Sequence, residues 1–208
     1  LFGLQDNSGL DPAGIDGADV LDGGAGNDLL RGNAGDDTLL GRAGDDNLRG
    51  DAGNDVLDGG EGVDVVSYRF DELTLTSGVF FSAASVGGGG TQMLADGLGG
   101  VDRLVDIERV VLTGSSFDDT LIGGSGSDQI TGGAGNDQLV GNGSEDLFIG
   151  DAGDDRLEGG DDWDIVAYIS ATSAITVDLR RTDSQAVGGD MGSDLLLSIE
   201  NVEGGAFN

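Results

Sequence analysis

Residues 23–60 read GGAGNDLLRGNAGDDTLLGRAGDDNLRGDAGNDVLDGG, and this stretch decides the fold. An aspartate recurs every nine residues from Asp19 to Asp64. Glycines precede each aspartate by two and by five positions, and an aliphatic residue follows it by two. The unit is therefore G-x-x-G-x-D-x-L-x, whose positions we number one to nine. Three columns that keep one register through six repeats are not an accident of composition.

The residue types of one unit predict a loop followed by a short strand. Glycines at positions one and four allow positive φ angles and a close approach of neighbouring chain. Asn or Asp at position five, as in Asn27 and Asp36, also tolerates left-handed backbone. We therefore expect the first six residues to turn carbonyls inward around an ion, with the aspartate closing the loop. The last three residues suffice for a very short strand.

One apolar residue in nine cannot bury a core, so the repeats have to stack. In a flattened coil, two repeats form one turn, and repeat n lies on repeat n+2 at the strand spacing of about 4.8 Å. The nine-residue register returns from Asp119 to Asp164 after an interruption. We therefore predict an all-β fold of two tandem parallel β-rolls, each followed by a small β flank.

The register and its interruptions divide the chain into five segments. Residues 1–13 are a cap or the tail of a preceding flank, 14–68 and 114–168 are the rolls, and 69–113 and 169–208 are β-rich flanks. The second flank ends at the start of a further array, and because the chain begins with Leu1, we expect a fragment or a processed product. Within the first flank, residues 101–112 form strands or a short helix, and their β-branched residues favour strands.

The two flanks repeat one another. Tyr68 recurs as Tyr168, and four residues of the first flank recur 92 positions later: Asp102, Ile107, Glu108 and Val110 match Asp194, Ile199, Glu200 and Val202. We expect the tyrosines to be structural caps. We expect Glu108 and Glu200 to hydrogen-bond a strand end, with an extra calcium ligand as the alternative.

The arrays resemble the RTX β-roll, whose calcium-binding repeat has the form Gly-Gly-x-Gly-x-Asp-x-Leu-x. The flanks are similar to those that join β-roll blocks in large RTX toxins and adhesins. The resemblance implies a secreted or cell-surface protein exported by type I secretion. It also implies that the position-six aspartates supply side-chain oxygens to calcium and that the glycine-rich loops supply carbonyls.

Composition agrees with a calcium-dependent extracellular chain. Forty acids against nine bases give a net charge of −31, which repels nucleic acid and anionic membranes and attracts divalent cations. No apolar run is long enough to span a bilayer. Because cysteine and histidine are absent, we do not expect zinc chemistry. Magnesium fits poorly because it requires small octahedral sites. Adjacent acids such as Asp36 and Asp37 are explained by ligation, so we predict no enzymatic activity.

Loops that share an edge of the roll should enclose the ions. Loops 14–19, 32–37 and 50–55 share one edge, and loops 23–28, 41–46 and 59–64 share the other. Two gaps on each edge give about four ions per array and roughly eight in all, fewer where a loop such as that of Phe117 caps the array. The expected ligands are Asp19, Gly23, Gly24, Gly26, Asn27, Asp28, Gly32, Gly35, Asp36, Asp37, Gly41, Gly44, Asp45, Asp46, Gly50, Gly53, Asp55, Asp64, Asp119, Gly123, Gly124, Gly126, Asp128, Gly132, Gly133, Gly135, Asn136, Asp137, Asp146, Gly150, Gly153, Asp154, Asp155 and Asp164.

The predicted function is calcium-induced folding and stability of a secreted protein. The predicted partners are calcium ions and neighbouring RTX blocks, with no nucleic acid and no membrane span. Two alternatives stay open: a repeat of a surface adhesin or S-layer protein whose flanks contact a partner, and an accessory calcium-binding region of an exported lipase or protease.

Overall fold

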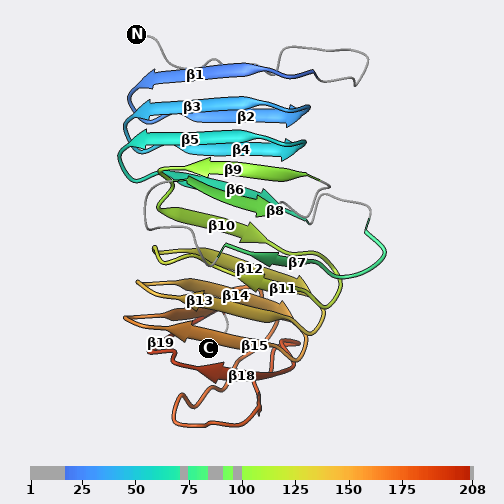
Figure 1. Cartoon of the computed structure of the whole chain (residues 1–208). Coiled ribbons are helices and arrows are strands. Elements are labelled where there is room, and N and C mark those ends of the chain that lie inside the picture. The colour runs from blue at the N-terminus through green and yellow to red at the C-terminus, as the bar shows by residue number, and fades with distance from the viewer. Residues whose placement is uncertain (1–16, 71–74, 84–90, 96–99, 207–208) are drawn as a thin grey trace. The chain divides into compact units, whose positions relative to one another are not determined.

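The structure, a computed structural model, describes residues 17–70, 75–83, 91–95 and 100–206. All regular structure in these ranges is β-strand, most of it parallel, so the predicted all-β fold is confirmed (Figure 1). Consequently, no helix in these ranges could span a membrane. Contacts divide the chain into unit 1, with residues 1–68 and 85–110, and unit 2, with residues 69–84 and 111–208.

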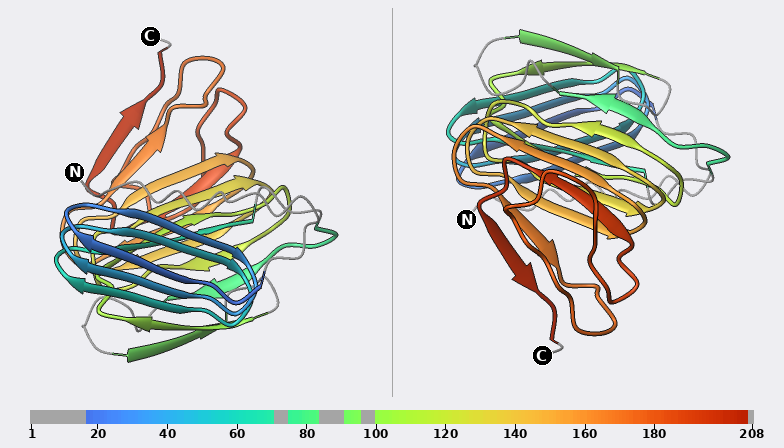
Figure 2. Two further views of the ribbon diagram at one scale, coloured as in Figure 1. Left: turned by 90° about the horizontal axis from the view of Figure 1, so that it is seen from above. Right: turned by 90° about the horizontal axis from the view of Figure 1, so that it is seen from below.

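Unit 1 is a roll of two sheets whose strands come alternately from the chain. Consecutive strands enter opposite sheets, and in Figure 2 the blue strands of this unit lie over one another along the stack. One sheet has the order β1 (Val20–Ala25), β3 (Thr38–Ala43), β5 (Val56–Glu61), β9 (Val101–Val105) and β8 (Thr91–Ala95). The other contains β2 (Leu29–Ala34), β4 (Asn47–Ala52) and β6 (Val65–Arg69).

Unit 2 repeats this arrangement. Its first sheet has the order β7 (Phe80–Ser82), β11 (Thr120–Ile122), β13 (Gln138–Asn142), β15 (Arg156–Gly160), β18 (Ser193–Leu197) and β17 (Gln185–Ala186). Its second sheet contains β10 (Arg109–Thr113), which pairs from Val111 onward with β12 (Gln129–Ala134), then β14 (Leu147–Ala152), β16 (Ile165–Tyr168) and β19 (Asn201–Gly204).

The strand register confirms that two repeats make one turn. Val20 lies opposite Thr38, eighteen residues later, and Thr38 lies opposite Val56. The prediction of three-residue strands was wrong for most repeats, since β3 has six residues and continues through Gly41–Ala43. Parallel pairing persists into the loop because each repeat lies directly on one of the same length.

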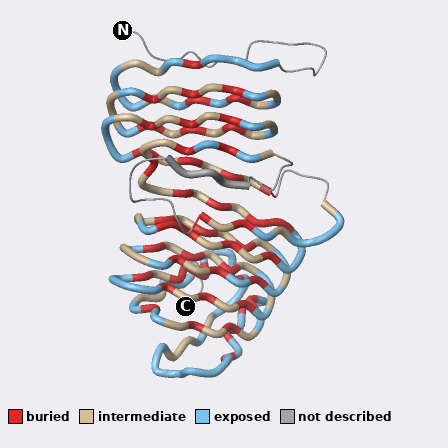
Figure 3. Tube along the Cα trace, in the orientation of Figure 1, coloured by how far each residue is buried: buried red, intermediate tan, exposed pale blue. Residues whose placement is uncertain are grey.

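The core is one side chain thick on each sheet. Side chains alternate along a strand, so position eight points inward while its neighbours point outward. Figure 3 shows the matching alternation of buried and less buried residues along the strands. Leu139 is fully buried and lies opposite Leu121 and Leu157 on the neighbouring strands. Gln138, which precedes it, is exposed.

The flanks continue the sheets. In unit 1, Leu104 of β9 lies opposite Leu57, so the segment Asp102–Leu104 takes the place of the Asp-x-Leu of a further repeat. In unit 2, Leu196 of β18 lies opposite Leu157. The antiparallel strands β8 and β17 then pair with β9 and β18. Residues 101–112 therefore hold β9 and most of β10, with residues 106–108 between them outside any strand, and the segment 69–113 supplies β7 to unit 2 and β8 and β9 to unit 1.

Candidate metal centre

The aspartates at position six form two hydrogen-bonded ladders in each unit. The backbone N–H of each aspartate donates to Oδ1 of the aspartate two repeats later, at N···O distances of 2.7 to 2.9 Å. Within unit 1, we call the edge with loops 17–19, 32–37 and 50–55 edge I and the edge with loops 23–28, 41–46 and 59–64 edge II. Within unit 2, edge I has loops 114–119, 132–137 and 150–155, and edge II has loops 123–128, 141–146 and 159–164. On each edge the structure stacks the predicted aspartates in register.

The second carboxylate oxygen of many of these aspartates has no partner. Oδ2 is buried and accepts no hydrogen bond, within the described part of the chain, in Asp28, Asp46, Asp64, Asp137, Asp155 and Asp164. Asp64 and Asp164 are fully buried residues. An unpaired buried charge is costly, so such groups pair, protonate or coordinate a metal. The oxygen atoms of the loops that contain these six aspartates therefore fit a cation.

The glycine at position one brings a second oxygen to the same place. A Cβ atom added to Gly23 would lie 2.7 Å from Oδ2 of Asp28 and 3.0 Å from the carbonyl oxygen of Gly41. The same pair, the loop's own Oδ2 and the carbonyl of the position-one glycine two repeats later, surrounds Gly32, Gly41, Gly114, Gly123, Gly132 and Gly141. The predicted close approach at position one is confirmed, and only glycine leaves room for these oxygens.

Positive φ angles occur at positions two and four. The prediction of positive φ was therefore right for position four and wrong for position one. Arg42 at position two has φ of +86°, and Gly44 at position four has +132°. The described position-one glycines have ordinary φ angles. At position four, Gly44 also packs on the carbonyl of Gly26, where any Cβ would collide with the backbone. The predicted ligands Gly24, Gly26, Gly35, Gly53, Gly133, Gly135 and Gly153 also have positive φ angles at these two positions.

Residues at position five form a further kind of ladder on the outside of the loops, which occurs on both edges of unit 1 and on edge I of unit 2. Oδ1 of Asn27 accepts from the N–H of Asp45, and Oδ1 of Asp45 accepts from the N–H of Val63. Predicted ligands in this ladder are Asn27, Asp36, Asp45, Asn136 and Asp154. The pKa of Asp36 lies below its usual value because its carboxylate accepts hydrogen bonds from the Asn54 backbone and side chain. This ladder was not anticipated, although the run of Asn and Asp at one position was its signal.

Two predicted ligands at the start of unit 2 are already satisfied by nearby donors. Oδ2 of Asp119 accepts from the Ser115 N–H, and its Oδ1 accepts from the Ser115 hydroxyl and the Val79 N–H. Oδ2 of Asp128 accepts from the Gly124 N–H at 2.6 Å. Both loops therefore present fewer open oxygens than loop 132–137, where Oδ2 of Asp137 accepts no hydrogen bond.

Sequence reasoning did not assign ligand-like positions to Asp102 and Asp194, which end the ladders of edge I. The N–H of Asp55 donates to Oδ1 of Asp102, and the N–H of Asp155 donates to Oδ1 of Asp194. The hydroxyls of Tyr68 and Tyr168 donate to their Oδ2 atoms at 2.7 Å. The tyrosines are thus buried structural caps, as predicted, and the 92-residue repeat was the signal for their partners.

Burial governs the electrostatics of both ladders. Removal from water is the largest cause that raises the pKa of Asp155 to about 8 and the pKa values of Asp64, Asp137 and Asp194 to about 6. The ladder hydrogen bonds oppose this shift, and neighbouring carboxylates add to it. Each ladder therefore concentrates buried negative charge that a divalent cation would offset.

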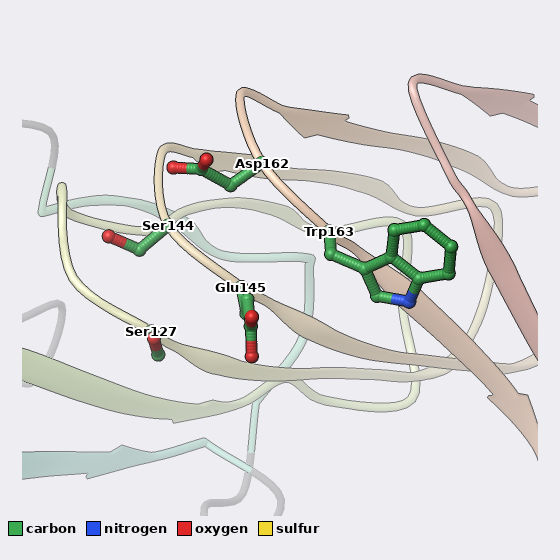
Figure 4. Close-up of a pocket in the computed structure, with 5 residues that line it drawn as sticks. All are labelled: Ser127, Ser144, Glu145, Asp162 and Trp163. Carbon is green, nitrogen blue, oxygen red and sulfur yellow. The ribbon is translucent and has the colours of Figure 1, made fainter.

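Edge II of unit 2 also carries a pocket of about 560 Å³ lined by Ser127, Ser144, Glu145, Asp162 and Trp163. Three of these residues, Ser127, Glu145 and Trp163, occupy position five of every second repeat, so they follow one another along edge II. Trp163 is 56% exposed. In Figure 4 its indole and the Asp162 carboxylate point in opposite directions from their loop. The pocket lining does not converge on a common point.

No three acidic side chains gather into a metal-binding cluster within the described ranges. A cation at the loops would therefore take one or two carboxylates and complete its shell with backbone carbonyls. Calcium accepts such mixed shells of six to eight oxygens, including backbone carbonyls. The oxygens around the position-one glycines are of this kind.

Comparison with known proteins identifies the repeat. The family model of the RTX calcium-binding nonapeptide repeat matches four times, at residues 14–48, 40–69, 113–148 and 140–168, more than half of the chain. Among solved structures, the crystal structure of the extracellular lipase LipA from Serratia marcescens matches at 26% identity, over 84% of this chain and 37% of that chain, with a TM-score of 0.32. No curated protein matches. The chain belongs to the family of the RTX calcium-binding nonapeptide repeat.

Proposed function

We propose that this chain is a calcium-dependent folding module. Ions between stacked loops stabilise each of its two β-rolls from within. The observation that carries the proposal is the recurring pair of oxygens at the position-one glycines. There a buried Oδ2 without a hydrogen-bond partner, such as that of Asp46, meets the carbonyl of the next loop, here that of Gly59. Position-six aspartates and loop carbonyls would hold calcium, which supplies the positive charge that the buried carboxylates lack.

The energetics make folding conditional on the ion. The chain carries a net charge of −31 and buries about one apolar side chain per nine residues in the arrays. Its 42 glycines make ordering the backbone costly. Each missing cation leaves a buried carboxylate that resists folding, so the free energy of calcium binding becomes folding free energy.

This coupling suits a protein that folds after export. We propose a secreted or cell-surface location and export by type I secretion. In the cytosol, low calcium keeps the chain loose enough to be threaded, and outside the cell, calcium at the 10⁻⁴–10⁻³ M affinities of extracellular modules folds it. Neighbouring RTX blocks of a longer chain would be its covalent partners.

We propose no catalytic role for the paired acids. The carboxylates at position five are acceptors in the outer ladder, and those at position six are acceptors in the inner ladders. The two acids of each pair therefore accept hydrogen bonds in different ladders. They contribute to the stacking of the loops and do not face one shared substrate.

Circular dichroism of the full chain against calcium concentration tests the proposal. We expect little β signal in excess chelator and a cooperative gain of β signal as calcium is added. Magnesium at the same concentration is the control and should restore much less, because it holds its water and prefers octahedral sites. A β spectrum that chelation leaves unchanged would refute calcium-dependent folding.

A further inference from the structure

The inner ladders of edge II do not end at the last repeat of either array. In unit 1, the N–H of Asp64 donates to Oε2 of Glu108 at 2.8 Å, the same distance as from Asp46 N–H to Oδ1 of Asp64. In unit 2, the N–H of Asp164 donates to Oε2 of Glu200 at 2.9 Å. The flank glutamates therefore occupy the place of a position-six aspartate one turn beyond the array.

The backbone of the flank continues the loop pattern as well. The carbonyl oxygen of Asp106 and Oδ2 of Asp64 lie together at the open face of Gly59, as the carbonyl of Gly59 and Oδ2 of Asp46 do at Gly41. In unit 2, the Ser198 carbonyl and Oδ2 of Asp164 meet at Gly159 in the same way. Asp106 and Ser198 share a left-handed backbone, with φ of +47° and +49°. The two flanks, which are repeats of one another but differ at this residue, thus place the same carbonyl in the same position.

The Oδ2 atoms at Gly59 and Gly159 do not face a gap between two nonapeptide loops. On edge II of unit 1, the two gaps between loops use Oδ2 of Asp28 and Oδ2 of Asp46. Oδ2 of Asp64 faces the flank turn instead, fully buried and without a hydrogen-bond partner, and Oδ2 of Asp164 does the same in unit 2. A buried anion left in this state costs free energy unless a cation or a proton meets it.

Edge I ends without this arrangement. The pairing of a flank carbonyl with a buried Oδ2 on edge II is therefore not a feature that every end of a stack shares. At Gly50 and Gly150, the three nearest atoms to an added Cβ all belong to the aspartate of the same loop, and no carbonyl of the flank is among them. The flank carboxylates there, Asp102 and Asp194, accept hydrogen bonds from buried tyrosine hydroxyls.

We propose that each roll holds one further divalent-cation site, built by the flank at the end of edge II. In unit 1 it consists of Oδ2 of Asp64, the carbonyl of Asp106 and the carboxylate of Glu108. In unit 2 it consists of Oδ2 of Asp164, the carbonyl of Ser198 and the carboxylate of Glu200. Two carboxylates balance one divalent charge, and an all-oxygen set with a backbone carbonyl suits calcium. This inference rests on the proposed calcium-binding function and adds two sites to the gaps between nonapeptide loops.

The number of bound calcium ions tests the sites. The variant Glu108→Gln with Glu200→Gln removes two charges but keeps a side-chain oxygen that accepts the ladder N–H. The matched control is Glu61→Gln with Glu203→Gln, which changes two exposed glutamates on strands of the same two units. Native mass spectrometry of the full chain at saturating calcium would count the ions, with circular dichroism as the measure of folding.

We expect the double glutamate variant to fold and to bind two ions fewer than the wild type, while the control binds the wild-type number. Each single variant should lose one ion. Equal ion counts for wild type and the double variant would overturn the two sites while leaving calcium-dependent folding in place, whereas a wild type that binds no calcium would refute the proposed function itself. Glu200 is exposed at the end of unit 2, so Glu200→Gln alone decides the question if the double variant does not fold.

Discussion

Replacing Leu139 with alanine tests whether the thin core and the calcium sites act as one system. Leu139 is fully buried on β13, between Leu121 and Leu157 of the adjacent strands, and it belongs to no predicted ligand set. The core has one inward side chain per strand crossing, so no second layer can move in to fill the space. The cost of the substitution should therefore be that of an ordinary large-to-small core change, about 2–5 kcal/mol.

Linkage converts this cost into a calcium requirement. If about four ions bind as the second array folds, calcium must supply the lost free energy through four binding terms. A loss of about 2–5 kcal/mol divided over four sites, with RT near 0.59 kcal/mol, raises the calcium midpoint of folding about 2- to 8-fold. Gln138→Ala, at the exposed neighbouring position, should cost under about 0.5 kcal/mol and shift the midpoint less than about 1.3-fold.

Circular dichroism of both variants across a calcium titration, at one salt concentration and temperature, measures these midpoints. Ions counted at saturating calcium should be equal in the two variants, because neither residue is a ligand. A larger shift for Gln138→Ala than for Leu139→Ala would refute the assignment of the inward column. An unchanged midpoint for Leu139→Ala would refute the coupling between core packing and calcium binding.

Three further perturbations follow from the ladders. Asp137→Asn should raise the calcium midpoint at least about 3-fold and Asp119→Asn less than about 2-fold, because Asp119 is already satisfied by Ser115; equal midpoints from the same titration would contradict this difference. Tyr168→Phe leaves Oδ2 of Asp194 without its donor, so thermal unfolding in calcium should show a loss of about 1.5–3 kcal/mol, and an unchanged melting temperature would argue against the cap. In calcium-free protein, acidification from pH 8 to pH 5 should increase the β signal. The pKa of Asp155 is about 8 in the fold and 3.8 in the unfolded chain, so the fold binds this proton more tightly. The stability that protonation of Asp155 contributes is complete below about pH 4 and is lost as the pH rises through about 8. Loss of β signal on acidification would contradict that sign.

The repeat period alone was enough to predict the stacked parallel strands and the stacking of the position-six aspartates. A nine-residue unit with one apolar residue has a single way to bury it, which is to place every second repeat directly above its predecessor. The pairing of Val20 with Thr38 and the stacked aspartates on both edges follow from that constraint. The need for glycine at position one was also predictable, because close approach of neighbouring loops excludes a side chain.

The tertiary structure decided which loop positions adopt positive φ angles and which carboxylate oxygens find a hydrogen-bond partner. The backbone adopts positive φ angles at positions two and four because the parallel pairing with the neighbouring repeat extends into the loop. The sequence of one repeat does not show this pairing. Oδ2 of Asp119 and Oδ2 of Asp46 differ in having a donor, although both occupy position six of the same motif.

The flanks show the same division most clearly. Their 92-residue repetition is visible in the sequence. Asp102 and Glu108, however, join the stacks by accepting from Asp55 and Asp64, which lie 47 and 44 residues earlier. Their roles as the last members of edge I and edge II depend on which strand each flank segment pairs with. Contacts between residues far apart along the chain are set by packing against an existing sheet, and a periodic pattern specifies such contacts only where the period itself continues.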